Sequence, residues 1–143
     1  MTRTSVELTL QFLRKLDYLR LTTAISRLVC ETVKPADVQE GFVNEVELAV
    51  SEACTNAIQH ADTRDGHGTV VISFQVYENR LIIEVKDQGA GFNMEDVPVP
   101  EFDEHPESGY GLYIIRSVMD EVQYTRGQSF NTLTMKKYFT KAP

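Results

Sequence analysis

Three side chains that could do chemistry recur at four-residue intervals in one stretch of the sequence: Glu52, Asn56 and His60. On a helix this spacing places a carboxylate, a carboxamide and an imidazole in one polar row. A neighbouring stripe on the same helix is apolar and consists of Val46, Ala49, Val50, Ala53 and Ala57. The polar row therefore borders the expected core, where polar groups need partners. It predicts either a ligand-binding row or a polar helix edge with ordinary partners, and His60 fits a supporting role better than a catalytic one.

A second candidate follows a predicted strand. Period-two alternation places Asp87 on the same face as Ile83 and Val85, so that its carboxylate ends a stripe expected to be buried. Gly89 and Gly91 come next, and glycines let a ligand approach the backbone closely. The exocyclic amine of a purine would supply the donor that this carboxylate needs. The alternative is an ordinary Asp-x-Gly turn at the end of a strand.

A third candidate opens a predicted helix with Ser108-Gly109-Tyr110-Gly111-Leu112. Backbone N–H groups and the positive end of the helix dipole are exposed at a helix start, and together they favour phosphate. The alternative is a glycine hinge. The sequence holds neither the P-loop pattern nor the dinucleotide fingerprint.

The elements that must position these candidates follow from the apolar periodicity. Their order is strand, two helices, two strands, a long loop, a helix and two strands. Helices are expected at Asp17–Val33, Glu45–Ala61 and Gly111–Met119, and strands at Ser5–Phe12, 70–76, 81–87, 122–126 and 132–139. In the first helix, the apolar positions with helical spacing are Leu21, Ala24, Ile25, Leu28 and Val29. Hairpins join most strands, which predicts an α+β two-layer sandwich: a mixed, mostly antiparallel sheet with helices on one face.

The segment Phe92–Ser108 shows no periodicity and contains three prolines and six carboxylates. A loop of this length inside a compact domain is usually a functional lid or disordered, and we expect a lid. No lysine or arginine occurs between Lys86 and Arg116. The whole chain, residues 1–143, is expected to form one domain.

The composition excludes several function classes. A net charge of −7 and a pI near 4.9 argue against direct binding to nucleic acid or to an anionic membrane surface. No apolar run approaches membrane-spanning length, and the first residues lack a secretory pattern. Cys30 and Cys54 lie among apolar neighbours in predicted helices, which favours reduced core thiols in a cytoplasmic protein.

The order of the motifs is specific: Glu-x-x-x-Asn on a helix, Asp-x-Gly-x-Gly after a strand, a lid, and Gly-x-Gly-Leu opening a helix. It resembles the ATP-binding fold of the GHKL superfamily, which includes gyrases, heat-shock chaperones, histidine kinases and mismatch-repair ATPases, over nearly the whole chain. Within that superfamily, the segments Ser51–Ala57 and Met119–Val122 resemble the anti-sigma-factor serine kinases. Those kinases phosphorylate an anti-anti-sigma antagonist and otherwise sequester a sigma factor. A detached histidine-kinase catalytic domain fits less well, because no phosphoacceptor hairpin precedes Glu45.

The resemblance implies ATP and Mg²⁺ as cofactors and a role for each matching residue. Glu52 would be the general base for the attacking hydroxyl, Asn56 would ligate Mg²⁺, and Asp87 would accept from the adenine amine. The remaining nucleotide-binding positions implied are Gly89 and Gly91 at the base and Gly109, Gly111 and Leu112 in the motif at the phosphates.

The function implied is that of an ATP-dependent serine kinase and anti-sigma factor, acting as a homodimer in a partner switch. The alternative is a nucleotide-gated binding module of the same fold with little or no kinase activity. One departure bears on this choice: many relatives carry a basic residue where this sequence has Glu107. A carboxylate there would repel a terminal phosphate, which puts the transfer rate in question more than ATP binding.

Overall fold

The computed structural model describes residues 3–59, 68–88 and 110–140. Within these ranges the elements are β1 (Val6–Leu13), η1 (Leu16–Tyr18), α1 (Leu19–Val33), α2 (Phe42–Gln59), β2 (Thr69–Val76), β3 (Arg80–Asp87), α3 (Gly111–Val118), β4 (Glu121–Arg126) and β5 (Asn131–Tyr138). This order matches the predicted succession. The largest difference at a helix start is at α2, which begins at Phe42, before the expected Glu45.

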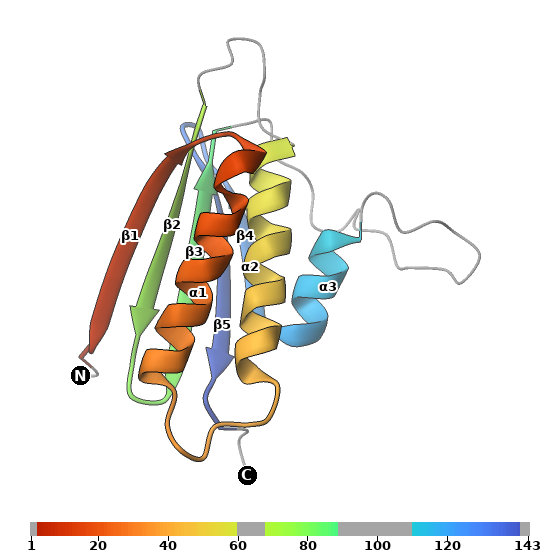
Figure 1. The fold of residues 1–143 in the computed structure, drawn as a ribbon. Coiled ribbons are helices and arrows are strands. Elements are labelled where there is room, and N and C mark those ends of the chain that lie inside the picture. The colour runs from red at the N-terminus through yellow and green to blue at the C-terminus, as the bar shows by residue number, and fades with distance from the viewer. Residues whose placement is uncertain (1–2, 60–67, 89–109, 141–143) are drawn as a thin grey trace.

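The strands of the described ranges form one five-stranded sheet in the order β1-β2-β3-β5-β4. Each described pairing is antiparallel. The helices lie on one face of this sheet, with α2 between α1 and α3 (Figure 1). The α+β two-layer sandwich predicted from the sequence is therefore confirmed.

The core lies between the sheet and α2. The buried strand residues follow the predicted alternation and include Val70, Ile72, Phe74 and Val76 of β2 and Leu81, Ile83 and Val85 of β3. The predicted stripe of α2 is buried at every position: Val46, Ala49, Val50, Ala53 and Ala57. Burying each large apolar side chain contributes roughly 1.5–3 kcal/mol, so this interface fixes the position of α2 on the sheet.

In α1 the buried face agrees only in part with the apolar positions named from the sequence. Leu21 and Leu28 are 45% and 66% exposed, and Ala24 is exposed as well. Of the named positions, Val29 is buried and Ile25 is half-buried, while Thr22, Ser26 and Cys30 complete the buried face. The apolar stripe was misleading because hydroxyls can enter a helix interface when they are satisfied locally. Those of Thr22 and Ser26 donate 2.8 Å bonds to backbone carbonyls of their own helix.

The strand β1 lies at one edge of the sheet. On the strand face shared by Val6, Leu8 and Phe12 the exposed fraction falls toward the C-terminal end: Val6 is 36% and Leu8 38% exposed, whereas Phe12 is buried. Among the helices that the structure describes, none combines the length and apolar character needed to cross a bilayer.

The two cysteines are free thiols buried in the core, as predicted. Burial raises the pKa of Cys30 from 9.0 to about 12 and that of Cys54 from 9.0 to about 12. Desolvation is the main cause in both, because the thiolate loses its hydration inside an apolar interface. At neutral pH both side chains are therefore protonated and unreactive.

We expect the native thiols to react with iodoacetamide roughly a thousandfold more slowly than thiols of the unfolded chain, because their pKa lies about three units higher. The free energy of unfolding should also fall as the pH rises above about 9, since only the unfolded thiols then ionise. A Cys30→Ala, Cys54→Ala double variant should lose less stability over that pH range. Rapid labelling of the native protein would contradict the buried placement.

Candidate functional site

The polar row predicted on α2 lies beside the core. Glu52 and Asn56 are half-buried, while Ala53 and Ala57, the next residue along in each case, are buried. The helix therefore holds a carboxylate and a carboxamide at the border between core and surface, where neither is fully solvated. His60, the third member of the row, lies outside the described residues.

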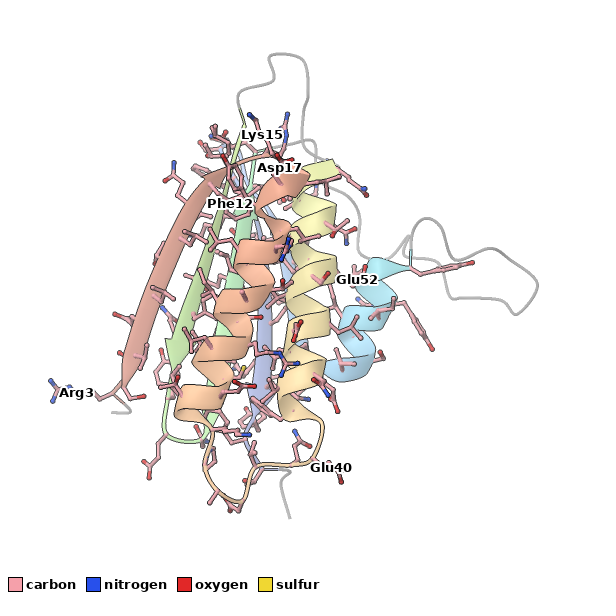
Figure 2. All side chains as sticks on the ribbon, viewed as in Figure 1. Arg3, Phe12, Lys15, Asp17, Glu40 and Glu52 are labelled. Atoms are coloured by element: carbon pink, nitrogen blue, oxygen red, sulfur yellow. The ribbon has the colours of Figure 1, made fainter. Side chains whose placement is uncertain are left out.

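The first residue of α3 packs directly against this row. A methyl group added to Gly111 would lie 3.0 Å from Glu52 Oε2 and 3.0 Å from Asn56 Nδ2. A side chain at this position would therefore need the two polar groups to move. Figure 2 shows Glu52 on α2, beside α3. The structure thus brings together three residues from two separate sequence motifs.

The start of α3 presents backbone amides near these side chains. N–H groups of the first helical turn have no partner within the helix, and they carry the positive end of the dipole. Leu112 and Ile115 anchor α3, with 4% and 0% of their surfaces exposed. Leu112 is thus a core residue by its side chain, and its expected part in nucleotide binding stays a prediction.

Asp87 ends β3 beside a buried partner that the sequence analysis did not identify. Asn131, the first residue of β5, is its register partner, and Asn131 Nδ2 donates a 3.1 Å hydrogen bond to Asp87 Oδ1. Asn131 is only 2% exposed. The bond orients the carboxylate of Asp87 at the end of the sheet where α3 begins (Figure 1).

A sequence signal for Asn131 does exist. Alternation along β5 places it on the same face as Leu133 and Met135, which are buried. An asparagine in an apolar register needs a polar partner, and Asp87 was the polar residue predicted at the end of a neighbouring buried stripe. The pairing of β3 with β5 was needed to connect the two.

Several expected site residues lie outside the described residues. They are Gly89, Gly91 and Gly109, together with the lid Phe92–Ser108 and its Glu107. Their roles stay predictions. Among the residues that are described, no three His, Cys, Asp or Glu side chains group to hold a metal ion.

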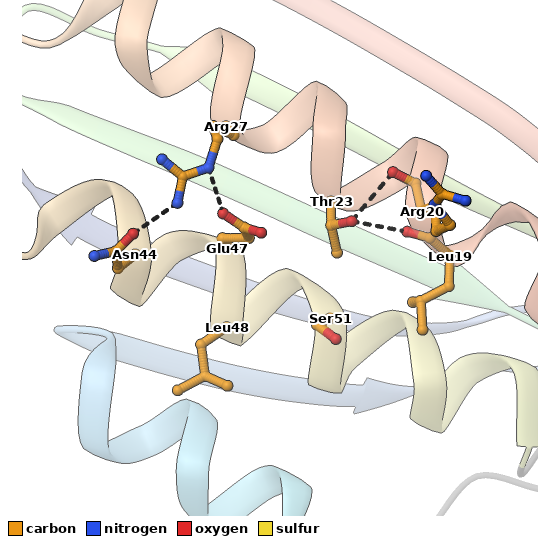
Figure 3. Close-up of a pocket in the computed structure, with 8 residues that line it drawn as sticks. All are labelled: Leu19, Arg20, Thr23, Arg27, Asn44, Glu47, Leu48 and Ser51. Atoms are coloured by element: carbon orange, nitrogen blue, oxygen red, sulfur yellow. Dashed lines mark hydrogen bonds and ion pairs between the residues drawn. The ribbon is translucent and has the colours of Figure 1, made fainter.

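A separate groove runs between α1 and α2 (Figure 3). It is lined by Leu19, Arg20, Thr23, Arg27, Asn44, Glu47, Leu48 and Ser51. Arg27 connects the two helices, with Nε 2.6 Å from Glu47 Oε2 and Nη2 2.6 Å from Asn44 Oδ1. The bond to Glu47 raises the pKa of the Arg27 guanidinium. The candidate site residues that the structure describes are not among those that line this groove.

The class of protein follows from the fold, from the motifs and from a family match. The chain matches the family described as histidine kinase-like ATPase domain over residues 15–137. Because this match spans most of the chain, the protein belongs to that family. The resemblance to the GHKL superfamily stated from the sequence is confirmed.

Two proteins that are similar in sequence to this chain are serine-protein kinases. The chain is 39% identical over 104 residues to the serine-protein kinase RsbW of Bacillus subtilis (strain 168). The aligned segment covers 67% of this chain and 64% of that protein. It is also 39% identical over 107 residues to the serine-protein kinase RsbW of Bacillus licheniformis, covering 69% and 66%. The chain thus spans less than two thirds of the length of these relatives.

Solved structures agree on the fold. One holds the RsbU and RsbW domains of Rv1364c from Mycobacterium tuberculosis, with a TM-score of 0.68 and 16% identity, covering 96% of this chain and 34% of that one. A histidine kinase domain from Erythrobacter litoralis EL346 gives a TM-score of 0.57 and 23% identity, covering 86% and 60%. At these identities the likeness extends to the fold alone.

The contact of Gly111 with the polar row can be tested without a ligand. Alanine in place of glycine usually stabilises a helix by about 0.5–1 kcal/mol. We expect Gly111→Ala to destabilise instead, by about 1–2 kcal/mol, because the methyl group overpacks against Glu52 and Asn56. Urea unfolding measures the change. In a double variant, Glu52→Ala should recover part of the loss, since only the contact with Asn56 then remains, and additive effects would contradict the contact with Glu52.

Proposed function

We propose that the protein is an ATP-dependent serine kinase and anti-sigma factor. In this proposal it phosphorylates a serine of an anti-anti-sigma antagonist and otherwise sequesters a sigma factor. Membership of the ATPase family and the likeness to serine-protein kinases support the proposal. The single observation that carries it is the placement of Gly111 against Glu52 and Asn56, because this contact joins the two motifs that the reaction needs.

The donor set fits ATP with Mg²⁺. The missing Cβ of Gly111 keeps α3 close to the polar row, so the amides of the first helical turn can face a phosphate. The amide oxygen of Asn56 is the kind of hard ligand that Mg²⁺ accepts, and phosphate oxygens and water complete such sites. Bound Mg²⁺ would supply charge neutralisation at the triphosphate. Asn56 would hold it, and no larger protein cage is needed.

Glu52 is the general base in this proposal. It lies one helical turn from Asn56, so its carboxylate can accept the proton of a serine hydroxyl directed at the terminal phosphate. The serine oxygen forms a bond to phosphorus while the bond to the leaving ADP oxygen breaks. The protein contributes position and charge in such a transfer, with little covalent chemistry of its own.

Asp87 is the residue proposed to recognise the adenine base. Asn131 donates a hydrogen bond to one oxygen of the Asp87 carboxylate, which restrains its rotation. A carboxylate fixed in this way accepts from the exocyclic amine of adenine and disfavours the carbonyl that guanine carries at the same position. Gly89 and Gly91 would allow the ring to approach the backbone.

A second candidate is a nucleotide-gated binding module without significant transfer. The sequence observation that favours it is Glu107, together with the absence of lysine and arginine between Lys86 and Arg116. That stretch therefore supplies no lysine or arginine to neutralise the terminal phosphate during transfer. Both candidates bind ATP and differ only in the chemical step.

The proposed assembly is a homodimer. Exposed apolar side chains on α1 and on the edge strand β1 offer a surface for it: Leu21, Leu28, Val6 and Leu8. Light scattering after size-exclusion chromatography measures the mass directly.

The Glu52→Gln variant separates the two candidates. It keeps the shape and hydrogen bonding of the side chain but removes the basic oxygen. We expect Mg-ATP affinity to stay within about threefold, while single-turnover phosphate transfer to the antagonist serine falls by roughly 10²–10⁴. A matched control is Glu47→Gln on the same helix, which lines the groove beside α1. If the wild type transfers no phosphate to a verified antagonist yet binds sigma factor in an ATP-dependent way, the binding module is correct.

Nucleotide identity tests the assignment of Asp87. By calorimetry, the wild type should bind ATP at least about tenfold more tightly than GTP, because guanine presents an acceptor to the carboxylate. Asp87→Asn should lose ATP affinity with little change in melting temperature. Glu84→Gln on the same strand is the control, since it alternates onto the opposite face. Equal affinities for ATP and GTP in the wild type would exclude the assignment.

A further inference from the structure

The buried face of β5 ends in a lysine. Met135, Lys137 and Phe139 alternate onto the core side, and Lys137 is only 3% exposed. Lysine is almost never buried to this extent unless its charge is paired. The function proposed above gives this side chain no role.

The ammonium of Lys137 connects three elements. Nζ donates a 2.9 Å bond to Glu45 Oε2 in the first turn of α2 and a 2.5 Å bond to the carbonyl oxygen of Val118, the last residue of α3. It also lies 5.7 Å from the ring centroid of Phe42, at the start of α2. One buried charge on the sheet thus holds the beginning of α2 and the end of α3.

The bond to Val118 meets a physical need of α3. The last carbonyls of a helix lack partners within the helix and carry the negative end of its dipole, so a cation there is favourable. The chain then turns into β4 at Asp120, whose N–H donates to the Lys136 carbonyl at 2.9 Å and whose Oδ2 accepts from the Tyr138 N–H at 2.7 Å. Polar contacts to β5 therefore fix this end of α3.

The other end of α3 is Gly111, which packs against Glu52 and Asn56. The helix is eight residues long and lies beside α2 (Figure 1), so it behaves as a short rod held at both ends. A shift of the rod along its axis would move Gly111 by the same amount. Such a shift would change the distance between the first-turn amides and the polar row.

We infer that Lys137 and Glu45 form a latch that sets the axial position of α3, and hence the phosphate-binding geometry at Gly111. Lys137 is thus a positioning residue: it contacts the C-terminal end of α3, while the triphosphate would bind at the N-terminal end of the same helix. The inference rests on the proposed function, because it assigns phosphate contacts to the start of α3. Recognition of the base by Asp87 and Asn131 does not depend on α3 and should be independent of the latch.

A purely structural role for the ion pair makes a different prediction. Removing one partner of a buried pair destabilises a protein, whereas replacing both by apolar residues is often neutral or stabilising. If the pair serves stability alone, the double replacement Glu45→Leu, Lys137→Met should restore both stability and ligand binding. If it is a latch, stability returns but triphosphate binding does not, since no cation then holds the Val118 carbonyl.

The experiment measures Mg-ATP and adenosine affinity by calorimetry for the wild type, Lys137→Met, the Glu45→Leu, Lys137→Met double variant and a control. Lys136→Met is the matched control, because Lys136 is the neighbouring lysine on β5 and pairs at 3.4 Å with Glu121, away from α3. We expect both latch variants to lose roughly ten- to a hundredfold in Mg-ATP affinity, as misplacement of a binding group does. Adenosine affinity should stay within about twofold, and the control should match the wild type for both ligands.

Amide exchange of the ligand-free proteins provides a readout that does not depend on nucleotide. The amides of α3 should exchange faster in both latch variants than in the control, while those of β2 and β3 stay protected. Unchanged exchange in α3, or equal losses of ATP and adenosine affinity, would overturn the latch. A wild type that binds neither ligand would overturn the proposed nucleotide site, and the exchange of α3 would then decide whether Lys137 positions this helix.

Discussion

The approach of α3 to the polar row of α2 is the contact on which the rest of the site depends. Glu52 and Asn56 belong to a helix whose apolar stripe is buried, so their backbone cannot move far without disturbing the core. Gly111 can reach them only because it has no side chain. A site built from two rigid helices holds its groups more precisely than one built from loops. Such precision suits phosphoryl transfer, which depends mainly on positioning.

Much of this arrangement could be predicted from the sequence because its patterns are local. Apolar residues recur with helical spacing in α2 and with strand spacing in β2, β3 and β5. Each of these patterns indicates which residues of a single element are buried. The polar row was predictable for the same reason, since Glu52 and Asn56 are neighbours on one helix face. The first helix was less predictable. Its apolar residues Leu21 and Leu28 face outward, while Thr22 and Ser26 satisfy their hydroxyls within the helix and enter the core.

The remaining part of the site could not be predicted because it depends on pairing between distant segments. Asn131 meets Asp87 only because β5 lies beside β3, although β4 precedes it in the chain. Lys137 meets Glu45 across most of the sequence. Each of these polar residues occupies a core register, which is a visible anomaly in the sequence. The partner of Asn131 became identifiable only from the order of the strands, and that of Lys137 only from the packing of the helices on the sheet.

The strand β5 has polar residues at both ends of its buried face, Asn131 at one and Lys137 at the other. Because side chains alternate, moving this strand by one position would turn both of them toward solvent at once. Insertions and deletions within β5, between Asn131 and Lys137, are therefore restricted by parity: only those of an even number of residues keep both side chains on the buried face. The contact of Asn131 with Asp87 and that of Lys137 with α3 lie at opposite ends of the strand. A shift in the register of β5 would nevertheless remove both contacts together.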